Sequence, residues 1–267
     1  MTVQSFKSIC QKSEDENYLF DKYIFRRISI FGTMFFAKLG VAPNTVTFLS
    51  LLSSLSSLWF FLQNDSVYLV AAAALIFFYH YLDHVDGELA RYYSWKTGKK
   101  NSMKGAYFDL LCHQYSVNLY FLCISVALYK ELQSDWVILV GVIAVVGTSS
   151  FPRLIAGKAL LNKICADRTV VNEPGMSDAL EIMNKKGEQI HAVRSAKLFS
   201  KAKIKKLAEE SIGYPGIINL LVIACLVDAY FQSYYCRMAL LCLTAAVRLV
   251  HSPILARRFM RALDQVY

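Results

Sequence analysis

The sequence predicts an all-α, polytopic membrane protein with six transmembrane helices and an amphipathic helix before them. Of its 267 residues, 55% are hydrophobic and only 18% are charged. The apolar residues come in blocks of about 20, which is the length of a helix that crosses a bilayer, and no alternation typical of a membrane barrel is present. These blocks fill most of the chain, which indicates one integral membrane domain over residues 1–267. The predicted spans are residues 45–63, 67–90, 106–129, 135–157, 214–232 and 236–255.

Basic residues are concentrated in some connections and nearly absent from others. The segment before the first span, the connection after the second, the long connection at about 158–213 and the C-terminal tail carry most of the lysines and arginines. The other three connections are short and hold little beyond Lys130 and Arg237. The positive-inside rule therefore predicts that both termini are cytoplasmic, in a bacterial-type inner membrane. The net charge of +9 follows from this topology and not from nucleic-acid binding.

Residues 1–40 form a segment that precedes the first span. Residues 19–39 mix aromatic and basic side chains, which predicts a helix at the cytoplasmic interface, and residues 195–210 have a similar character. The first 20 residues contain no apolar stretch, so we expect no cleavable signal peptide. The seven cysteines include no C-x-x-C pair, which argues against a cysteine-based zinc site or a disulfide framework.

Acidic residues and glycines recur at helical spacing where the second span ends and the third begins. One face of the second span carries Asp83, Asp86, Gly87 and Ala90. On the third span, Asp109 and His113 are four residues apart, with Gly105 one turn earlier. Because both helix ends lie at the same predicted depth, these side chains can converge.

Three carboxylates at the edge of the hydrocarbon need a counter-charge. Each costs about 2.5–3.5 kcal/mol at the centre of an inserted helix, and together they repel one another. A divalent cation relieves both problems, and oxygen ligands favour Mg²⁺ or Mn²⁺, as one or two ions. Asp83, Asp86 and Asp109 are therefore the predicted metal ligands. Arg91 is placed to bind a phosphate, and Gly87 and Gly105 let a ligand approach the backbone.

This segment resembles the signature of the CDP-alcohol phosphotransferase (CDP-alcohol phosphatidyltransferase) family, D-x2-D-G-x2-A-R-x8-9-G-x3-D-x3-D. The matching residues, in order, are Asp83, Asp86, Gly87, Ala90, Arg91, Gly105 and Asp109. Upstream, the run from Ala42 to Thr47 resembles the family's lead into its first span, with Asn44 and Thr47 also interpretable as a helix N-cap and its N3 residue.

The resemblance implies transfer of a phospho-alcohol from a CDP-linked donor to a hydroxyl acceptor, with release of CMP, in lipid or glycolipid biosynthesis. It implies that the three acids hold the metal and that Gly87, Ala90, Arg91 and Gly105 bind the CDP moiety. One of the two substrates is expected to be a lipid, the active site to be cytoplasmic, and the protein to form a homodimer.

The sequence departs from the family pattern at two places. Thirteen residues separate Arg91 from Gly105, so an enlarged, lysine-rich loop is expected. His113 stands where the family has its last Asp, which is assigned as a metal ligand and as the base that deprotonates the acceptor. We expect His113 to act as the base, with an unperturbed pKa of about 6.5, while a ligand role stays open.

Other basic residues are weaker candidates. Arg153 and Arg248 fall toward the cytoplasmic ends of the fourth and sixth spans and could bind an anionic acceptor. Snorkelling is the default interpretation of a single such residue. His80 shares a face with Asp83 and is interpreted as a packing residue, whereas His84 points off that face.

Three other functions compete with the transferase. A prenyltransferase would need a second Asp-rich motif. A small cation or solute transporter would need acids in several spans, yet the first and sixth spans contain neither Asp nor Glu, and the fourth has only Asp135, at its first position. A catalytically divergent protein of the same fold remains compatible with His113.

Overall fold

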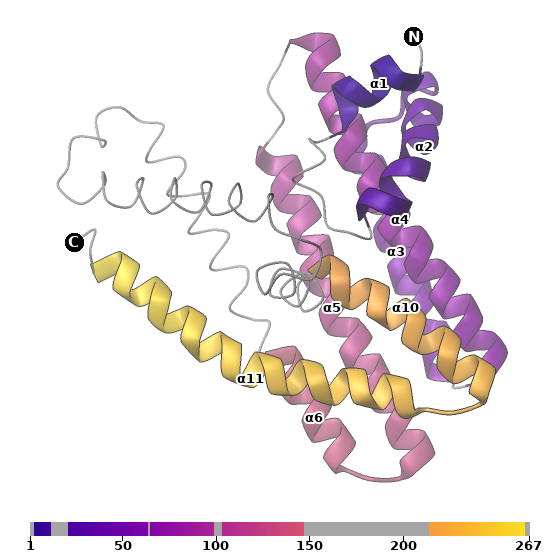
Figure 1. Ribbon diagram of the computed structural model, residues 1–267, viewed down its shortest axis with the longest axis vertical. Coiled ribbons are helices and arrows are strands. Elements are labelled where there is room, and N and C mark those ends of the chain that lie inside the picture. The colour runs from indigo at the N-terminus through magenta and orange to yellow at the C-terminus, as the bar shows by residue number, and fades with distance from the viewer. Residues whose placement is uncertain (1–2, 12–20, 64, 99–102, 147–213, 265–267) are drawn as a thin grey trace, which may run out of the picture.

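The structure is a computed structural model that describes residues 3–11, 21–63, 65–98, 103–146 and 214–264 (Figure 1). Every regular element within these ranges is a helix, which confirms the all-α prediction for this part of the chain. The elements are α1 (Val3–Cys10), the π-helix η2 (Asp21–Phe25), α2 (Arg26–Lys38), α3 (Pro43–Gln63), α4 (Ser66–Thr97), α5 (Met103–Leu132), α6 (Trp136–Val146), α10 (Tyr214–Phe231) and α11 (Tyr235–Asp264).

Each of the six predicted spans overlaps a helix, in order α3, α4, α5, α6, α10 and α11. Within the described residues, α3, α4 and the Leu111–Leu132 part of α5 are long and apolar enough to cross a membrane. The helix α6 and the Gly216–Phe231 part of α10 are apolar but shorter, and residues 147–157 of the predicted fourth span lie outside the described ranges. The chain thus has the helices of an integral membrane protein, and six complete spans stay a prediction.

The helix α3 turns its small polar residues inward and its large apolar residues outward. Ser53 and Ser54 are buried, whereas Phe48 and Trp59 are 49% and 66% exposed. The Ser53 hydroxyl donates to the Leu75 carbonyl of α4 at 2.8 Å. This arrangement suits a helix whose outer face meets lipid, because small residues permit close approach of neighbouring helices.

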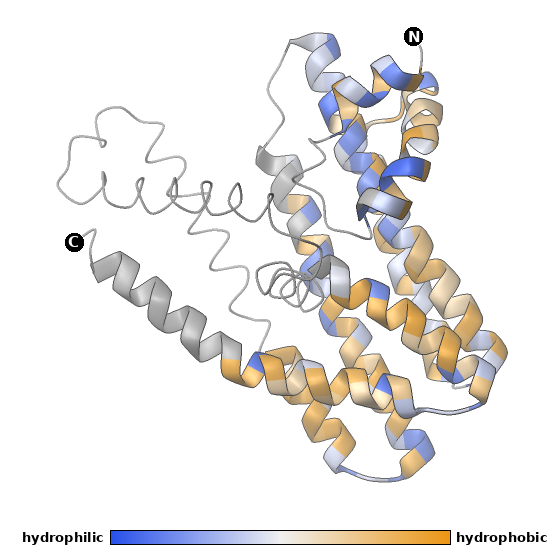
Figure 2. Cartoon of the chain, in the orientation of Figure 1, coloured by the Kyte–Doolittle hydropathy of each residue, from blue (hydrophilic) through white to orange (hydrophobic). Residues whose placement is uncertain are grey.

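The main apolar core lies between α3, α4, α5, α6, α10 and α11. Figure 2 shows these helices as largely hydrophobic, with hydrophilic residues more frequent at the end of the bundle that carries α1 and α2. At the opposite end, Asp228 of α10 caps α11. Its carboxylate accepts hydrogen bonds from the backbone N–H groups of Cys236 and Arg237 and from Arg237 Nε, at 3.0, 2.9 and 3.0 Å.

The N-terminal helices are attached to α4 through the fully buried carboxyl group of Glu88. Ser29 and Thr33 of α2 donate their hydroxyls to it, each at 2.7 Å. Arg26 donates from 3.1 Å and Gln11, just after α1, from 2.9 Å. A buried carboxyl group requires such partners, so Glu88 determines which face of α2 packs on α4.

The opposite face of α2 is apolar and exposed. Phe31 and Phe35 are 62% and 57% exposed, although their helix buries Ser29 and Thr33. The helices η2 and α2 occupy residues 21–38 of the segment predicted to be amphipathic, and they bury Ser29 and Thr33 against the protein. The predicted amphipathic helix at 19–39 and its interfacial position stay predictions, and the similar segment at 195–210 lies outside the described residues.

Close packing of α6 on α5 predicts the effect of a single methyl group. A Cβ placed on Gly141 would overlap the Oγ and Cβ atoms of Ser125. Gly141→Ala should therefore destabilise the protein by about 1–3 kcal/mol, seen as a lower Tm in detergent. Adding Ser125→Gly to Gly141→Ala should recover most of this loss, and a double variant no more stable than the single one would contradict the packing.

Candidate active site

Three side chains that the sequence predicts to converge, from the middle of α4 and the first half of α5, lie close together. His113 Nε2 is 2.9 Å from Asp83 Oδ1 and 3.1 Å from Asp109 Oδ1. One ligand atom from each of these three residues fits within 4.8 Å of the others. Asp86 is within electrostatic range of Asp83 and Asp109. We call Asp83, Asp86, Asp109 and His113 the carboxylate centre.

Asp86 is held by a residue of α3. The Thr47 hydroxyl donates to Asp86 Oδ2 at 2.6 Å and is also 3.2 Å from the Pro43 carbonyl oxygen. The interpretation of Asn44 as an N-cap is wrong, because α3 already begins at Pro43, the residue type favoured at a first helical position. Thr47 is thus a partner of a predicted metal ligand, which no local pattern in the sequence indicates.

His113 is fixed from its other side by Tyr79 of α4. The Tyr79 hydroxyl lies 2.8 Å from His113 Nδ1, which leaves Nε2 directed at the two carboxylates. A residue that bonds one imidazole nitrogen selects the tautomer and therefore the role of the other. Sequence reasoning missed Tyr79, although its place one turn before Asp83 on α4 was a signal.

The predicted nucleotide-binding glycines have protein neighbours. A Cβ at Gly105 would lie 3.1 Å from Asn44 Oδ1, so the missing side chain lets α5 approach the start of α3. A Cβ at Gly87 would lie 3.5 Å from Arg91 Nη1. The space beside Gly87 is therefore next to the Arg91 guanidinium, one helical turn further along α4.

Arg91 is anchored through the N-terminal segment. Its Nε donates to the backbone carbonyl of Cys10 at the end of α1. This contact fixes the guanidinium from one side and keeps its Nη1 and Nη2 atoms near Gly87. The geometry explains how an arginine at this position can be held ready for an anion.

The enlarged spacing between Arg91 and Gly105 is not an enlarged loop. The helix α4 continues to Thr97, Gly98 follows with a left-handed φ of 67°, and α5 begins at Met103. Six of the thirteen intervening residues thus extend α4. The expectation of a long loop is wrong because residues 92–97 continue the helix and contain neither Gly nor Pro.

The two candidate acceptor-binding arginines are not both described. Arg153 lies outside the described residues. Arg248 donates to the Ala144 carbonyl, its guanidinium carbon lies 4.7 Å from the centre of the Phe121 ring, and it borders a mostly apolar pocket between α10 and α11. An acceptor-binding role for either residue stays a prediction.

The carboxylate centre falls within a region that matches a known family. Residues 40–166 match the family model described as CDP-alcohol phosphatidyltransferase. This region is similar to the CDP-alcohol phosphatidyltransferase domain that the model describes. Together with the signature residues, the match supports a transferase of lipid biosynthesis that takes a phospho-alcohol from a CDP-linked donor.

A solved structure is similar in fold to this protein over more of the chain than residues 40–166. The phosphatidylinositol phosphate synthase of Mycobacterium tuberculosis, crystallised with CDP-DAG bound, is 16% identical, with a TM-score of 0.52. The match covers 90% of this chain and 94% of that one. No curated protein matches the sequence. The similarity in structure therefore extends over residues on both sides of the domain.

Thr47 provides a test of how Asp86 is held. Thr47→Val keeps the shape but removes the donor to Asp86, so the concentration of Mg²⁺ or Mn²⁺ needed for half-maximal activity should rise about 10-fold. Ser57→Ala is the matched control, because its hydroxyl donates to the Ser54 carbonyl of the same helix. An unchanged metal requirement in Thr47→Val would show that Thr47 does not support a ligand.

Proposed function

We propose that the protein transfers a phosphatidyl group from a CDP-diacylglycerol-type donor to the hydroxyl of a polar alcohol. In this reaction the acceptor oxygen bonds the phosphorus that carries the lipid alcohol, the bond from that phosphorus to CMP breaks, and the hydroxyl proton is released. The convergence of Asp83, Asp109 and His113 within the phosphatidyltransferase domain carries the proposal. The lipid donor is supported by the donor bound in the mycobacterial synthase.

The carboxylate centre has the composition of a site for Mg²⁺ or Mn²⁺. Asp109 Oδ1 is buried and has no hydrogen-bond partner among the described residues, so a cation would satisfy it. Asp83, Asp86 and Asp109 would hold one or two such ions, with Thr47 orienting Asp86. When bound, the metal neutralises the pyrophosphate charge and stabilises the departing phosphate.

His113 is proposed as the base that takes the proton of the acceptor hydroxyl. In the tautomer whose Nδ1–H donates to the Tyr79 oxygen, the Nε2 lone pair is directed at the place where the two carboxylates meet. A ligand role for Nε2 would use the same tautomer, so the two roles are separated by activity measurements and not by geometry.

Arg91 is proposed to bind a phosphate of the donor. Its Nε is engaged by Cys10, and its Nη atoms lie beside Gly87. Gly87, Ala90 and Gly105 would leave the space that the nucleotide occupies. In this arrangement the N-terminal segment positions the phosphate-binding residue of the domain.

The protein is proposed to lie in a bacterial-type inner membrane with this centre facing the cytoplasm. The distribution of basic residues supports that orientation. The outward apolar face of α2 supports contact of the N-terminal segment with lipid. A homodimer, and an anionic acceptor bound by Arg153 or Arg248, complete the proposal.

Release of CMP tests the reaction directly. Purified protein in detergent should release CMP from a CDP-diacylglycerol donor only with Mg²⁺ or Mn²⁺ and an alcohol, screened as inositol phosphate, glycerol phosphate and serine. Asp83→Asn should reduce the rate by more than about 100-fold. Asp65→Asn is the matched control, because Asp65 caps the other end of α4 and Asn is an equally good cap. If CMP is released only from a CDP-linked head group in the presence of diacylglycerol, the lipid is the acceptor and not the donor.

The pH dependence and two substitutions test His113. A base must be neutral to accept a proton, so the logarithm of kcat should fall on acidification with a slope of about one. His113→Ala should lose most of its activity, and its remaining kcat should no longer decrease on acidification. His113→Asp should retain activity, with the decrease in kcat moved to lower pH. Near-full activity in His113→Ala would refute the base role.

Tyr79→Phe tests the orientation of His113. Loss of the hydroxyl should reduce kcat by about 10–100-fold with little change in KM for the donor. Tyr120→Phe is the matched control, since it removes a buried hydroxyl that bonds Ser54 instead. Equal effects in the two variants would show that the loss is one of stability and not of orientation.

A further inference from the structure

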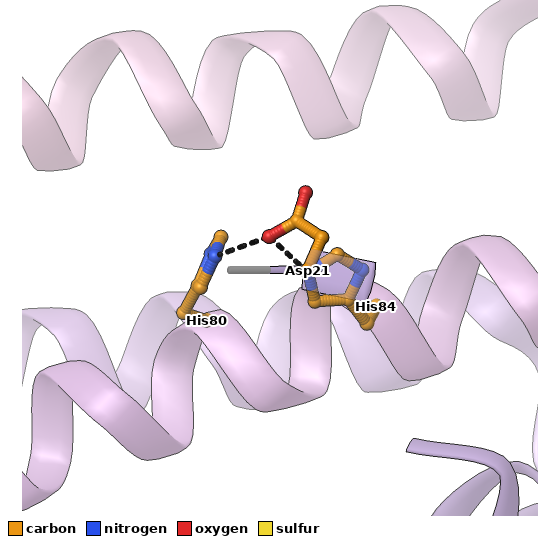
Figure 3. Close-up of side chains that lie close together, drawn as sticks. All are labelled: Asp21, His80 and His84. Atoms are coloured by element: carbon orange, nitrogen blue, oxygen red, sulfur yellow. Dashed lines mark ion pairs between the residues drawn. The ribbon is translucent and has the colours of Figure 1, made fainter. Parts of the chain in front are cut away.

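A second group of ligand-type side chains lies next to the carboxylate centre without sharing a residue with it. Asp21, the first residue of η2, lies between His80 and His84 of α4 (Figure 3). The three residues are 5%, 1% and 8% exposed. We call them the histidine cluster, and no step of the transferase reaction uses it.

The distances in the histidine cluster match those between ligands of one metal ion. Asp21 Oδ1 is 3.4 Å from His80 Nε2 and 3.2 Å from His84 Nε2. Ligands at about 2.0–2.1 Å from a tetrahedral zinc ion lie about 3.3–3.4 Å from one another. Imidazoles separated by one helical turn occupy the same helix face, as in known zinc sites on helices.

Two buried atoms of the cluster, one from Asp21 and one from His84, are not satisfied by hydrogen bonds. Asp21 Oδ1 and His84 Nε2 are both buried, and neither has a hydrogen-bond partner among the described residues. Their 3.2 Å separation therefore lacks the direction of a hydrogen bond. Buried polar atoms left in this state are costly, and a cation bound between them removes the cost.

The surroundings of the cluster favour a ligand that stays bound. Phe25, itself 1% exposed, covers both imidazoles, with its ring centre 4.4 Å from that of His80 and 5.2 Å from that of His84.

We propose that Asp21, His80 and His84 bind a divalent transition-metal ion of the zinc type, distinct from the ion of the carboxylate centre. Two imidazoles and one carboxylate favour such an ion over Mg²⁺, which prefers oxygen ligands. A water molecule or the second Asp21 oxygen would complete the coordination. The proposed ligands come from two elements that are far apart in the sequence, so the fold itself brings them together.

Such an ion would connect the N-terminal segment to the catalytic helix. Asp21 begins η2, which leads directly into α2, and His80 lies one turn before Asp83. His80 Nδ1 is 3.9 Å from Asp83 Oδ2, beyond a hydrogen bond but close enough for electrostatic interaction. The ion would therefore hold His80 in place beside a ligand of the carboxylate centre, as a structural metal does.

Metal content of the full-length protein tests the proposal. Protein purified in detergent and dialysed against excess Mg²⁺ should retain one equivalent of Zn²⁺ or accept one of Co²⁺, the latter with the intense visible bands of tetrahedral cobalt. To exclude binding at the carboxylate centre, the reference protein is Asp109→Asn/His113→Ala, which should keep this ion. Asp21→Asn or His84→Ala in that background should lose it.

A variant that exchanges one ligand for another separates lost binding from lost folding. Asp21→Cys supplies a thiolate, so it should retain the ion, and added Zn²⁺ should raise its Tm as in the wild type but not that of Asp21→Asn. The proposal is overturned if the reference protein binds no Zn²⁺ or Co²⁺, or if Asp21→Asn and His84→Ala bind as much as the reference. These measurements require no turnover, so they are independent of the proposed transferase reaction.

Discussion

The buried and half-buried polar side chains of α4 constrain the helices that pack against it. Asp83 meets His113 of α5, Asp86 accepts from Thr47 of α3, and Glu88 accepts from two hydroxyls of α2. In an apolar environment each of these groups requires a partner, and each partner comes from a different helix. Polar contacts therefore determine which helices pack against α4, which apolar packing alone could not do. The same contacts bring the reactive groups together.

Helical periodicity predicted which residues share a face of one helix, and this is why Asp83, Asp86, Asp109 and His113 could be proposed from the sequence. It could not predict partners across helices. Thr47 and Asp86 are 39 positions apart, and Ser29 and Glu88 are 59 apart, so no local pattern connects them. Contacts between helices depend on the angles at which the helices pack, and these angles cannot be inferred from a single sequence.

Two local interpretations were wrong or incomplete for identifiable reasons. The larger spacing between Arg91 and Gly105 does not produce a longer loop, because residues 92–97 favour a helix. His84 lies off the helix face of Asp83, but it is four residues after His80, and two histidines at this spacing are typical of metal ligation. The third member, Asp21, comes from a separate segment, so only the structure reveals the cluster.

The contact between Arg91 and the Cys10 carbonyl changes where the functional unit begins. The family model starts at residue 40, yet the anchor of Arg91, the partners of Glu88 and the carboxylate beside His80 and His84 all precede that position. A fragment cut at the domain boundary would expose a buried carboxyl group and release the guanidinium. For this protein, the first forty residues belong in any expressed fragment, and an affinity tag is better attached away from α1.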